Sequence, residues 1–573
     1  VKIPEAQQQI AATSQAEIDE ALGVLQAHKQ EWADLSLDAR IALLGQLRDG
    51  VMGAIEGWIA AACKAKGIAR GSHQEGEEWL AGPTPVIRNI NLLIKALEDV
   101  KNHGAPRLPS PAFVGTSGQV VAPVVPVDNW DKLLFTGFSA EVWMEPGVTL
   151  ANLTQHQAAF YKQDSPTGKV ALVLGAGNVS SIGPMDALYK LFVEGQVVLV
   201  KTNPVNEYLG PFWDESFAVL RDRGFFRVAY GGALEGDYLC QHDLVDEIHI
   251  TGSDKTHDAI VFGVGEDGDR RKSAKEPRND KPITSELGNV SPMIIVPGPW
   301  SQSDLDFHGV NLASSLCNNA GFNCNATRVI IQHEGWDQRE GLLDATRRAF
   351  DKTPQRKPYY PGARDRHETF VGKHPKADQY GTRDNDGVPW TLISHLNPDN
   401  VDDICFNMES WCGVTSEVAL PAKSVADYID AAVAFCNDRV WGSLNAGIIV
   451  HPKSLKDPTV KAAVDRAIAN LRAGAIGVNH WPALAYAFVS PTWGAFPGHD
   501  LYDIRSGRGV VHNTYLFDRP QKSVVRGPFR VAPRPIWFVD HKQAAALGRK
   551  VAYFNADPSI RRIPSILWSA IRG

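Results

Sequence analysis

Residues 170–203, VALVLGAGNVSSIGPMDALYKLFVEGQVVLVKTN, decide the fold class. Two runs of Val and Leu, at 170–174 and 197–200, enclose a helical segment over 183–195. Short continuous apolar runs are typical of parallel strands buried on both faces, and parallel neighbours need a long crossover between them, usually a helix. The stretch therefore predicts a β-α-β unit.

The alternation of predicted strands and helices continues toward the C-terminus. FRVAYGG (226–232) and EIHITGS (247–253) predict further strands of this unit, with a helix over 210–223 before them. A second α/β unit is predicted from five more apolar runs, at 292–297, 326–332, 417–421, 444–450 and 473–479. The polar residues 351–399 are predicted to be surface elaboration.

The N-terminal part of the chain predicts helices in place of alternating strands and helices. Residues 8–102 predict helices, because apolar residues recur at steps of three and four. Proline and glycine in 103–127 predict an irregular connection. Extended structure resumes near 139–147, and with residues 159–162 it predicts a hairpin or an arm.

Composition excludes several classes of protein. The 573 residues carry 58 Lys and Arg against 65 Asp and Glu, so no basic field predicts binding to nucleic acid. Seven cysteines without paired Cys-x-x-Cys spacing predict neither a disulfide framework nor a metal site, and they favour a reducing compartment, the cytoplasm. The sequence shows no signal-peptide pattern and no apolar run long enough to span a membrane.

Two residues are candidates for the chemistry of acyl transfer. Cys324 lies in CNNAGFNCNATRVII (317–331), among small and polar residues that allow close approach of a ligand, and a thiolate there would be a nucleophile. Glu286, in KPITSELGNVSP (281–292), stands where a strand begins and could act as a general base. Taken singly, a lone cysteine is more often a small buried hydrophobe, and a loop glutamate is more often a cap.

The ends of the predicted strands carry further polar candidates. Asn178, in GAGN, could donate to an oxyanion or simply shape a turn, and the string lacks the third glycine of a dinucleotide fingerprint. Lys201 could bind ribose hydroxyls, and Gly252 with Ser253 could meet a pyrophosphate through backbone N–H groups. The alternative readings are a solvated lysine and an ordinary helix start.

Taken together, these strings resemble the aldehyde dehydrogenase superfamily over about 140–526. ELGNVSP resembles its glutamate motif, GFNCNATRV its cysteine motif, and GAGN stands at its oxyanion asparagine. VVLVKTNP, the segment from Gly232, and HITGSDKT match its cofactor strands in order, and NMESWCGVTSEVAL, which contains Glu409, resembles the segment that touches the nicotinamide ribose.

The resemblance implies an α/β, aldehyde dehydrogenase-like fold with two Rossmann-like parallel-sheet domains, a β oligomerisation arm and an N-terminal helical extension. It implies six segments: an N-terminal helical layer and connection (1–137), the first part of the arm (138–166), a nicotinamide cofactor-binding domain (167–288), a catalytic domain (289–489), the second part of the arm (490–530) and a C-terminal extension (531–573).

The resemblance also implies an activity, the NAD(P)-dependent oxidation of an aldehyde to a carboxylic acid. Cys324 would form a thiohemiacetal and then a thioester, Asn178 would hold the oxyanion, and Glu286 would activate water. Lys201, Gly232, Gly252, Ser253 and Glu409 would bind the cofactor, NAD or NADP. The substrate is expected to be a hydrophobic aldehyde, and the assembly a homodimer or homotetramer.

Departures from the family pattern keep two alternatives open. GAGN also resembles the branch that reduces fatty acyl groups, so an acyl-CoA reductase or CoA-acylating enzyme using Cys324 is the second hypothesis. A catalytically silent scaffold is the third. Aromatic and basic residues after 530 suggest contact with a membrane surface, although packing on the chain itself or on a neighbour is the favoured interpretation.

Overall fold

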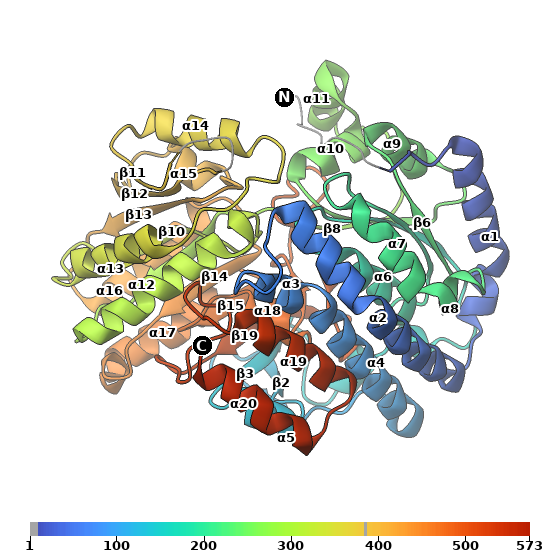
Figure 1. Cartoon of the computed structure of the whole chain (residues 1–573), viewed down its shortest axis with the longest axis horizontal. Coiled ribbons are helices and arrows are strands. Elements are labelled where there is room, and N and C mark those ends of the chain that lie inside the picture. Colours follow the sequence, from blue (N-terminus) through green and yellow to red (C-terminus); the bar gives the residue numbers. More distant parts are fainter. Residues whose placement is uncertain (1–9, 383–386) are drawn as a thin grey trace.

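Two β-sheets with helices on their faces organise the molecule, as the computed structural model shows for residues 10–382 and 387–573 (Figure 1). The smaller sheet has six strands in the order β17-β8-β7-β4-β5-β6, and all but β17 are parallel. Its strands are β4 (Val170–Leu174), β5 (Val197–Lys201), β6 (Phe226–Ala229), β7 (Glu247–Thr251), β8 (Ile283–Glu286) and β17 (Gly507–Arg508). Its helices are α6 (Ile182–Phe192), α7 (Gly210–Ser216), α8 (Ala218–Arg221), α9 (Ala233–Gln241), α10 (Asp254–Phe262) and α11 (Gly265–Ala274).

The larger sheet has eleven strands in the order β1-β2-β3-β19-β15-β14-β9-β10-β13-β12-β11. The seven from β19 to β12 are parallel, and antiparallel strands extend both edges. The parallel strands are β9 (Ser291–Ile295), β10 (Thr327–His333), β12 (Trp390–Leu396), β13 (Val414–Leu420), β14 (Asn445–Ile449), β15 (Ala475–Val478) and β19 (Pro520–Arg526). The others are β1 (Phe113–Val114), β2 (Val120–Val125), β3 (Ser139–Met144) and β11 (Asp378–Tyr380). The predicted α/β fold with parallel sheets is confirmed.

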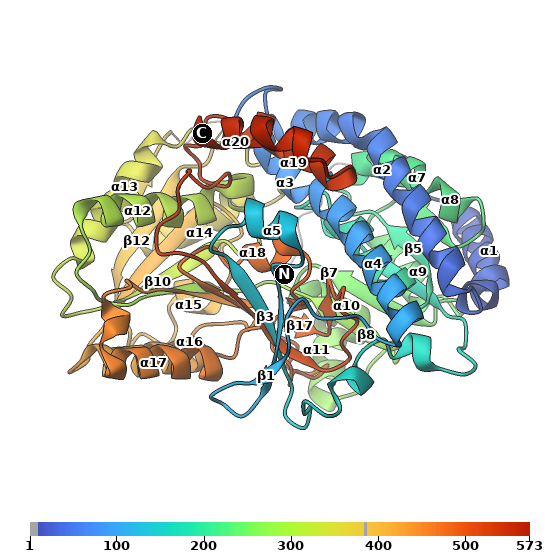
Figure 2. The same ribbon diagram turned by 90° about the horizontal axis from the view of Figure 1, so that it is seen from below.

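Helices cover both faces of the larger sheet. α12 (Gln302–Cys317) and α13 (Arg339–Lys352) pack together on one face, and α16 (Val425–Asp438) and α17 (Pro458–Asn470) on the other (Figure 2). The remaining short elements are α5 (Asn129–Leu134), α14 (Ala363–Lys373), α15 (Ile404–Asn407), α18 (Leu484–Phe488) and the strand pair β16 (Trp493–Gly494) with β18 (Val510–Val511).

The N-terminal helices form a layer over the smaller sheet and its crossovers. They are α1 (Gln15–Ala33), α2 (Leu37–Lys66), α3 (Glu75–Ala81) and α4 (Pro83–His103). A capping box of Ser14 and Glu17 starts α1, and Gly67, with a left-handed φ of 67°, ends α2. α1 packs on β4, β5 and β6, whereas α2 packs on α7 and α8.

The C-terminal residues fold back on this layer. α19 (Ala544–Ala556) packs against α3 and α4 (Figure 1). Arg549 Nε of α19 donates to Glu56 Oε1 of α2 at 2.7 Å. α20 (Ile563–Ile571) follows and leaves Trp568 and Ile571 exposed. Among the helices of the described residues, none combines the length and the apolarity that a bilayer crossing requires.

Two predictions of secondary structure were wrong, and one of two alternatives is excluded for a third segment. The segment 351–399 holds β12, a buried parallel strand, because Trp390 and Leu392 point into the core although polar residues surround the strand in sequence. The connection 103–127 contains β2, whose one proline, Pro123, lies near an edge of the sheet. The extended segment predicted near 139–147 contains β3, but β3 pairs with β2 and β19 and not with residues 159–162, where a short 3₁₀ turn forms, so the hairpin alternative is wrong.

Candidate active site

The carboxyl edge of the smaller sheet carries the predicted cofactor residues. Lys201 ends β5, Gly252 and Ser253 follow β7, and Glu286 ends β8. The chain goes from β4 to β5 on one side and returns to β7 on the other, so the ends of β4 and β7 form a topological switch point, where α/β proteins bind ligands. The Gly252 N–H donates to the Glu286 carbonyl at 3.0 Å, which joins the two predicted sites directly.

The predicted cofactor residues differ in their surroundings. Gly252 is exposed, and Ser253 caps α10, its Oγ accepting from the Thr256 N–H at 3.1 Å. Gly232 lies beyond the edge strand β6, and its N–H already donates to Glu235 Oε2 at 2.7 Å. Gly252 and Ser253 therefore offer backbone to a ligand more directly than Gly232 does.

Cys324 sits at the end of a strained loop. The loop follows α12, and its residues Asn319, Ala320 and Gly321 take left-handed φ values of 52°, 57° and 82°. Such a conformation costs roughly 1–2 kcal/mol for each residue that has a Cβ, so surrounding contacts must hold it. The Cys324 carbonyl accepts from Ser291 Oγ at 3.1 Å and from Asn445 Nδ2 at 3.2 Å, which fixes the half-buried cysteine beside the larger sheet.

Glu286 and Cys324 are neighbours. Burial, with the Glu286 charge and a hydrogen bond to it, raises the pKa of the Cys324 thiol well above its ordinary range. Burial and the nearby Asp186 carboxylate raise the pKa of Glu286 to about 8. Glu286 Oε1 has no hydrogen-bond partner among the described residues, so one carboxyl oxygen is free to meet a water or a substrate. The predicted nucleophile and base thus lie together in a buried site.

Asn178 reaches the loop of the cysteine from the other sheet. It is buried, and its Nδ2 donates to the Phe322 carbonyl at 2.9 Å, two residues before Cys324. The amide is therefore bonded to the loop that carries the cysteine, close to it in sequence.

Glu409 approaches the same place from the segment between α15 and β13. A Cβ on Gly288 would lie 2.2 Å from Glu409 Oε2, so the absence of a side chain there makes room for the carboxylate. Burial raises the pKa of Glu409 to about 8 against the opposing effect of Arg328. Its charge also contributes to the raised pKa of Cys324, which places Glu409 near the nucleophile.

A buried lysine behind the site was not predicted. Lys66, at the end of α2, donates from Nζ to Glu78 Oε1 at 2.9 Å, to the Asn178 carbonyl at 3.1 Å and to Asn319 Oδ1 at 3.0 Å. Asn319 Nδ2 donates to the same Asn178 carbonyl at 2.9 Å. Lys66 falls on the apolar three- and four-residue steps of α2, a signal in the sequence that a lysine is buried.

Asp186 is a second residue that sequence reasoning missed. It lies in the otherwise apolar helix α6, is buried, and accepts from Thr251 Oγ1 at 2.8 Å. His249 Nε2 lies 3.4 Å from its Oδ2. A lone carboxylate in an apolar helix is the signal that could have found it.

Comparisons with known proteins agree with this geometry. Residues 140–362 match the model of the aldehyde dehydrogenase family. The 4-trimethylaminobutyraldehyde dehydrogenases of Bos taurus and Homo sapiens are 36% and 35% identical over 129 residues, 22% of this chain and 22% of each relative. The match thus spans about a fifth of the length of these curated relatives.

Solved structures extend the likeness in fold to most of the chain. Aldehyde dehydrogenase 21 from Physcomitrella patens, in complex with succinate, aligns with a TM-score of 0.60 at 14% identity, over 90% of both chains. A putative aldehyde dehydrogenase from Burkholderia cenocepacia aligns with a TM-score of 0.58 at 18% identity, over 90% of this chain and 93% of that one. The resemblance predicted from the motifs is confirmed: residues 140–362 match the aldehyde dehydrogenase family in sequence, and most of the chain has the fold of solved aldehyde dehydrogenases.

Proposed function

We propose that this chain oxidises an aldehyde to a carboxylic acid with NAD(P) as hydride acceptor. The observation that carries the proposal is the meeting of Cys324, Glu286 and Asn178, from three separate segments, at one place beside a topological switch point. A nucleophile, a base and an oxyanion donor within one site are what thioester chemistry needs.

The residues act in order. The Cys324 thiol gives its proton to the adjacent Glu286 carboxylate, and sulfur attacks the aldehyde carbon, so that the carbonyl oxygen becomes an oxyanion. Asn178 Nδ2, turning from the Phe322 carbonyl, and the Cys324 N–H donate to that oxygen. After oxidation the carbon is a thioester. Glu286 then releases the thiol proton to solvent. As a carboxylate again, it takes a proton from water while the water attacks the thioester carbon, and the C–S bond breaks, so that the acid leaves and sulfur returns as thiolate.

The residues around the switch point fit a nicotinamide dinucleotide. The exposed Gly252 at the start of α10 leaves room for phosphate, Lys201 ends the neighbouring part of the sheet, and Glu409 Oε1 is a buried acceptor without a partner among the described residues. When bound, the cofactor supplies the hydride acceptor. An enzyme of the same fold from Pseudomonas syringae was solved in complex with NAD+ and octanal. Another, from Bacillus halodurans, was solved in complex with NADP. These structures support either cofactor.

The substrate class is proposed from the walls of the site. Cys324 packs at the border of an apolar cluster that includes Met144, Phe488 and Trp493. An apolar surround favours a hydrophobic aldehyde, whose remaining polar atom is the carbonyl oxygen. The expected assembly is a homodimer or homotetramer. The expected compartment is the cytoplasm, because the cysteines have no paired spacing that would favour disulfides.

Absorbance of the reduced nicotinamide tests the proposal. The purified chain is given aldehydes of increasing chain length with NAD+ or NADP+, and CoA is left out. Cofactor reduction is expected with wild type and with Cys436→Ala, which removes another buried cysteine, but not with Cys324→Ala. Reduction that requires CoA, or oxidation of NAD(P)H by acyl-CoA alone, would instead support the CoA-dependent alternative. Nicotinamide binding without turnover in either assay would support the scaffold hypothesis.

A further inference from the structure

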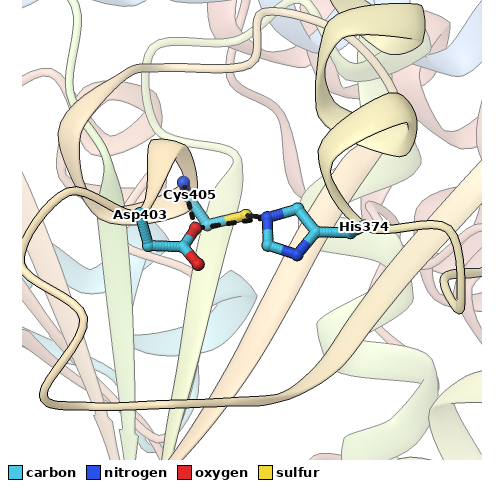
Figure 3. A group of neighbouring side chains, drawn as sticks. All are labelled: His374, Asp403 and Cys405. Atoms are coloured by element: carbon cyan, nitrogen blue, oxygen red, sulfur yellow. Dashed lines mark hydrogen bonds and ion pairs between the residues drawn. The ribbon is translucent and has the colours of Figure 1, made fainter.

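Three side chains with metal-ligating atoms converge far from Cys324 in sequence. His374 follows α14, while Asp403 and Cys405 start α15, and the three side chains point toward one another (Figure 3). His374 Nε2 lies 3.6 Å from Cys405 Sγ and 3.3 Å from Asp403 Oδ1, and all three ligand atoms lie within 4.8 Å of each other. We propose that His374, Asp403 and Cys405 bind a divalent transition metal ion, with zinc(II) as the chemically preferred ion.

The separations suit a tetrahedral zinc ion. Zinc bonds are about 2.3 Å to thiolate sulfur, about 2.0–2.1 Å to imidazole nitrogen and about 2.0–2.2 Å to carboxylate oxygen. At tetrahedral angles these lengths put nitrogen and sulfur about 3.6 Å apart, and nitrogen and oxygen about 3.3–3.5 Å apart. The observed 3.6 Å and 3.3 Å match these two of the three edges. A nitrogen, an oxygen and a sulfur ligand together favour zinc over calcium or magnesium, which prefer oxygen alone.

Two polar atoms of the trio share one ring nitrogen, although the Cys405 thiol also has hydrogen bonds to Asp403 and Ser416. Cys405 Sγ and Asp403 Oδ1 both lie against the same ring nitrogen, His374 Nε2. That nitrogen carries at most one hydrogen, directed along the ring plane, or one lone pair, so it can serve only one of the two neighbours well. A cation between the three atoms accepts a lone pair from each. Cys405 binds as the thiolate, and its proton leaves to solvent.

The surroundings hold two of the ligands and leave one side open. Asp403 and Cys405 are buried, whereas the His374 side chain is 18% exposed, so a water can take the fourth position from the solvent side. The Cys405 N–H donates to Asp403 Oδ1 at 2.9 Å, which orients the carboxylate as outer hydrogen bonds do around metal ligands. This site could not be predicted from the sequence, because Asp403-x-Cys405 and a histidine far upstream do not match the spacing of a known metal-binding motif.

The ion would join two elements near the proposed cofactor site. It would tie the end of α14 to the start of α15, and Glu409 follows α15 directly. The Phe406 carbonyl in α15 accepts from the Trp441 N–H at 2.8 Å, so this turn is also bound to the segment before β14. A metal there would stabilise the segment that presents Glu409, without taking part in the reaction.

Cobalt(II) titration of the metal-stripped full chain tests the proposal, because tetrahedral cobalt gives visible d–d bands and thiolate ligation gives a near-ultraviolet charge-transfer band. We expect one ion per chain, displaced by zinc. His374→Gln and Cys405→Ser should weaken binding by more than about 100-fold, beyond the about 10–100-fold typical of outer-shell changes. Asp403→Asn, which keeps a cap on α15, should weaken it less. Cys436→Ser, at a buried cysteine of α16, is the matched control and should bind as wild type.

Two results would overturn the proposal. One is the absence of both bands at micromolar cobalt in a folded protein. The other is unchanged stoichiometry and charge transfer in His374→Gln, a partly exposed position whose change leaves the core intact. The readout is spectroscopic and needs no turnover, so failure of the proposed oxidation would leave this test standing.

Discussion

Replacing Lys66 by Met tests whether the N-terminal layer positions the catalytic loop. The change keeps the length of the side chain and removes its charge and three donated hydrogen bonds, to Glu78, to the Asn178 carbonyl and to Asn319. Glu78 then stays buried without its cation. Removing one partner of a buried ion pair costs about 3–5 kcal/mol, so urea denaturation should show a loss of this size in the free energy of unfolding.

The effect on activity has a separate cause. Without Lys66, the left-handed Asn319 and the Asn178 backbone lose a shared anchor, and the amide and the Cys324 loop shift together. Outright loss of an oxyanion donor costs about 10²–10³ in kcat, and a displaced one should cost less. We expect kcat to fall about 10–100-fold with little change in the KM for NAD(P), and the alkylation rate of Cys324 by iodoacetamide to change with it.

A double variant separates positioning from stability. Lys66→Met/Glu78→Gln removes the stranded charge, so most of the unfolding free energy should return, while the contacts to Asn178 and Asn319 stay broken and kcat stays low. Lys64→Met, at an exposed lysine of the same helix, is the control and should match wild type. The reasoning would be refuted by a Lys66→Met enzyme with wild-type kcat, or by a double variant that recovers stability and kcat in parallel.

Three further predictions concern the site and the assembly. The rate of acid release should rise as pH passes through about 8, because Glu286 acts as a base only when it is ionised and its pKa is raised to about 8; stopped-flow turnover of Glu286→Gln should lack this rise, and a pH-independent wild type would contradict the assignment. In Gly288→Ala the new Cβ would lie 2.2 Å from Glu409 Oε2, so the KM for NAD(P) should rise severalfold while Cys324 alkylation stays unchanged, and an unaltered KM would remove Glu409 from the cofactor site. Sedimentation should give the mass of two or four chains; a single-chain mass would contradict the oligomer and agree with the pairing of β3, β19 and β15 within one chain.

Local patterns predicted the parallel strands well. The runs at 292–297, 326–332, 444–450 and 473–479 all became buried strands of the larger sheet, because each carries enough apolar residues to be recognised alone. β12 was missed, since its burial depends on the neighbours β13 and β11 and not on its own composition. Strand order and the pairing of β19 with β3 come from tertiary contacts that no single stretch specifies.

Some residues of the candidate site could be predicted from the sequence, and others could not. Cys324, Glu286 and Asn178 could be named from the sequence, because each stands in a string whose chemistry is readable next to a strand. Lys66 and the cluster of His374, Asp403 and Cys405 could not be assigned to a site from the sequence, because their roles depend on residues that lie beside them only in the folded chain. The raised pKa of Glu286 likewise depends on burial and on Asp186, which lies on a different element.

The left-handed loop at 319–321 links the evolution of the N-terminal helices to that of the nucleophile. Residues outside the two sheets contribute to the shape of this loop: Lys66 donates to Asn319 Oδ1, and Glu77 Oε2 accepts from the Asn319 N–H at 3.0 Å. A shorter ancestor that began at the connection after α4 would keep both sheets and every residue of the proposed chemistry, including the contacts of Ser291 and Asn445 to Cys324, yet Asn319 would lose its bonds to Lys66 and Glu77. The N-terminal helices and the nucleophile are therefore expected to be inherited and exchanged as one unit, although no atom of those helices takes part in the proposed reaction.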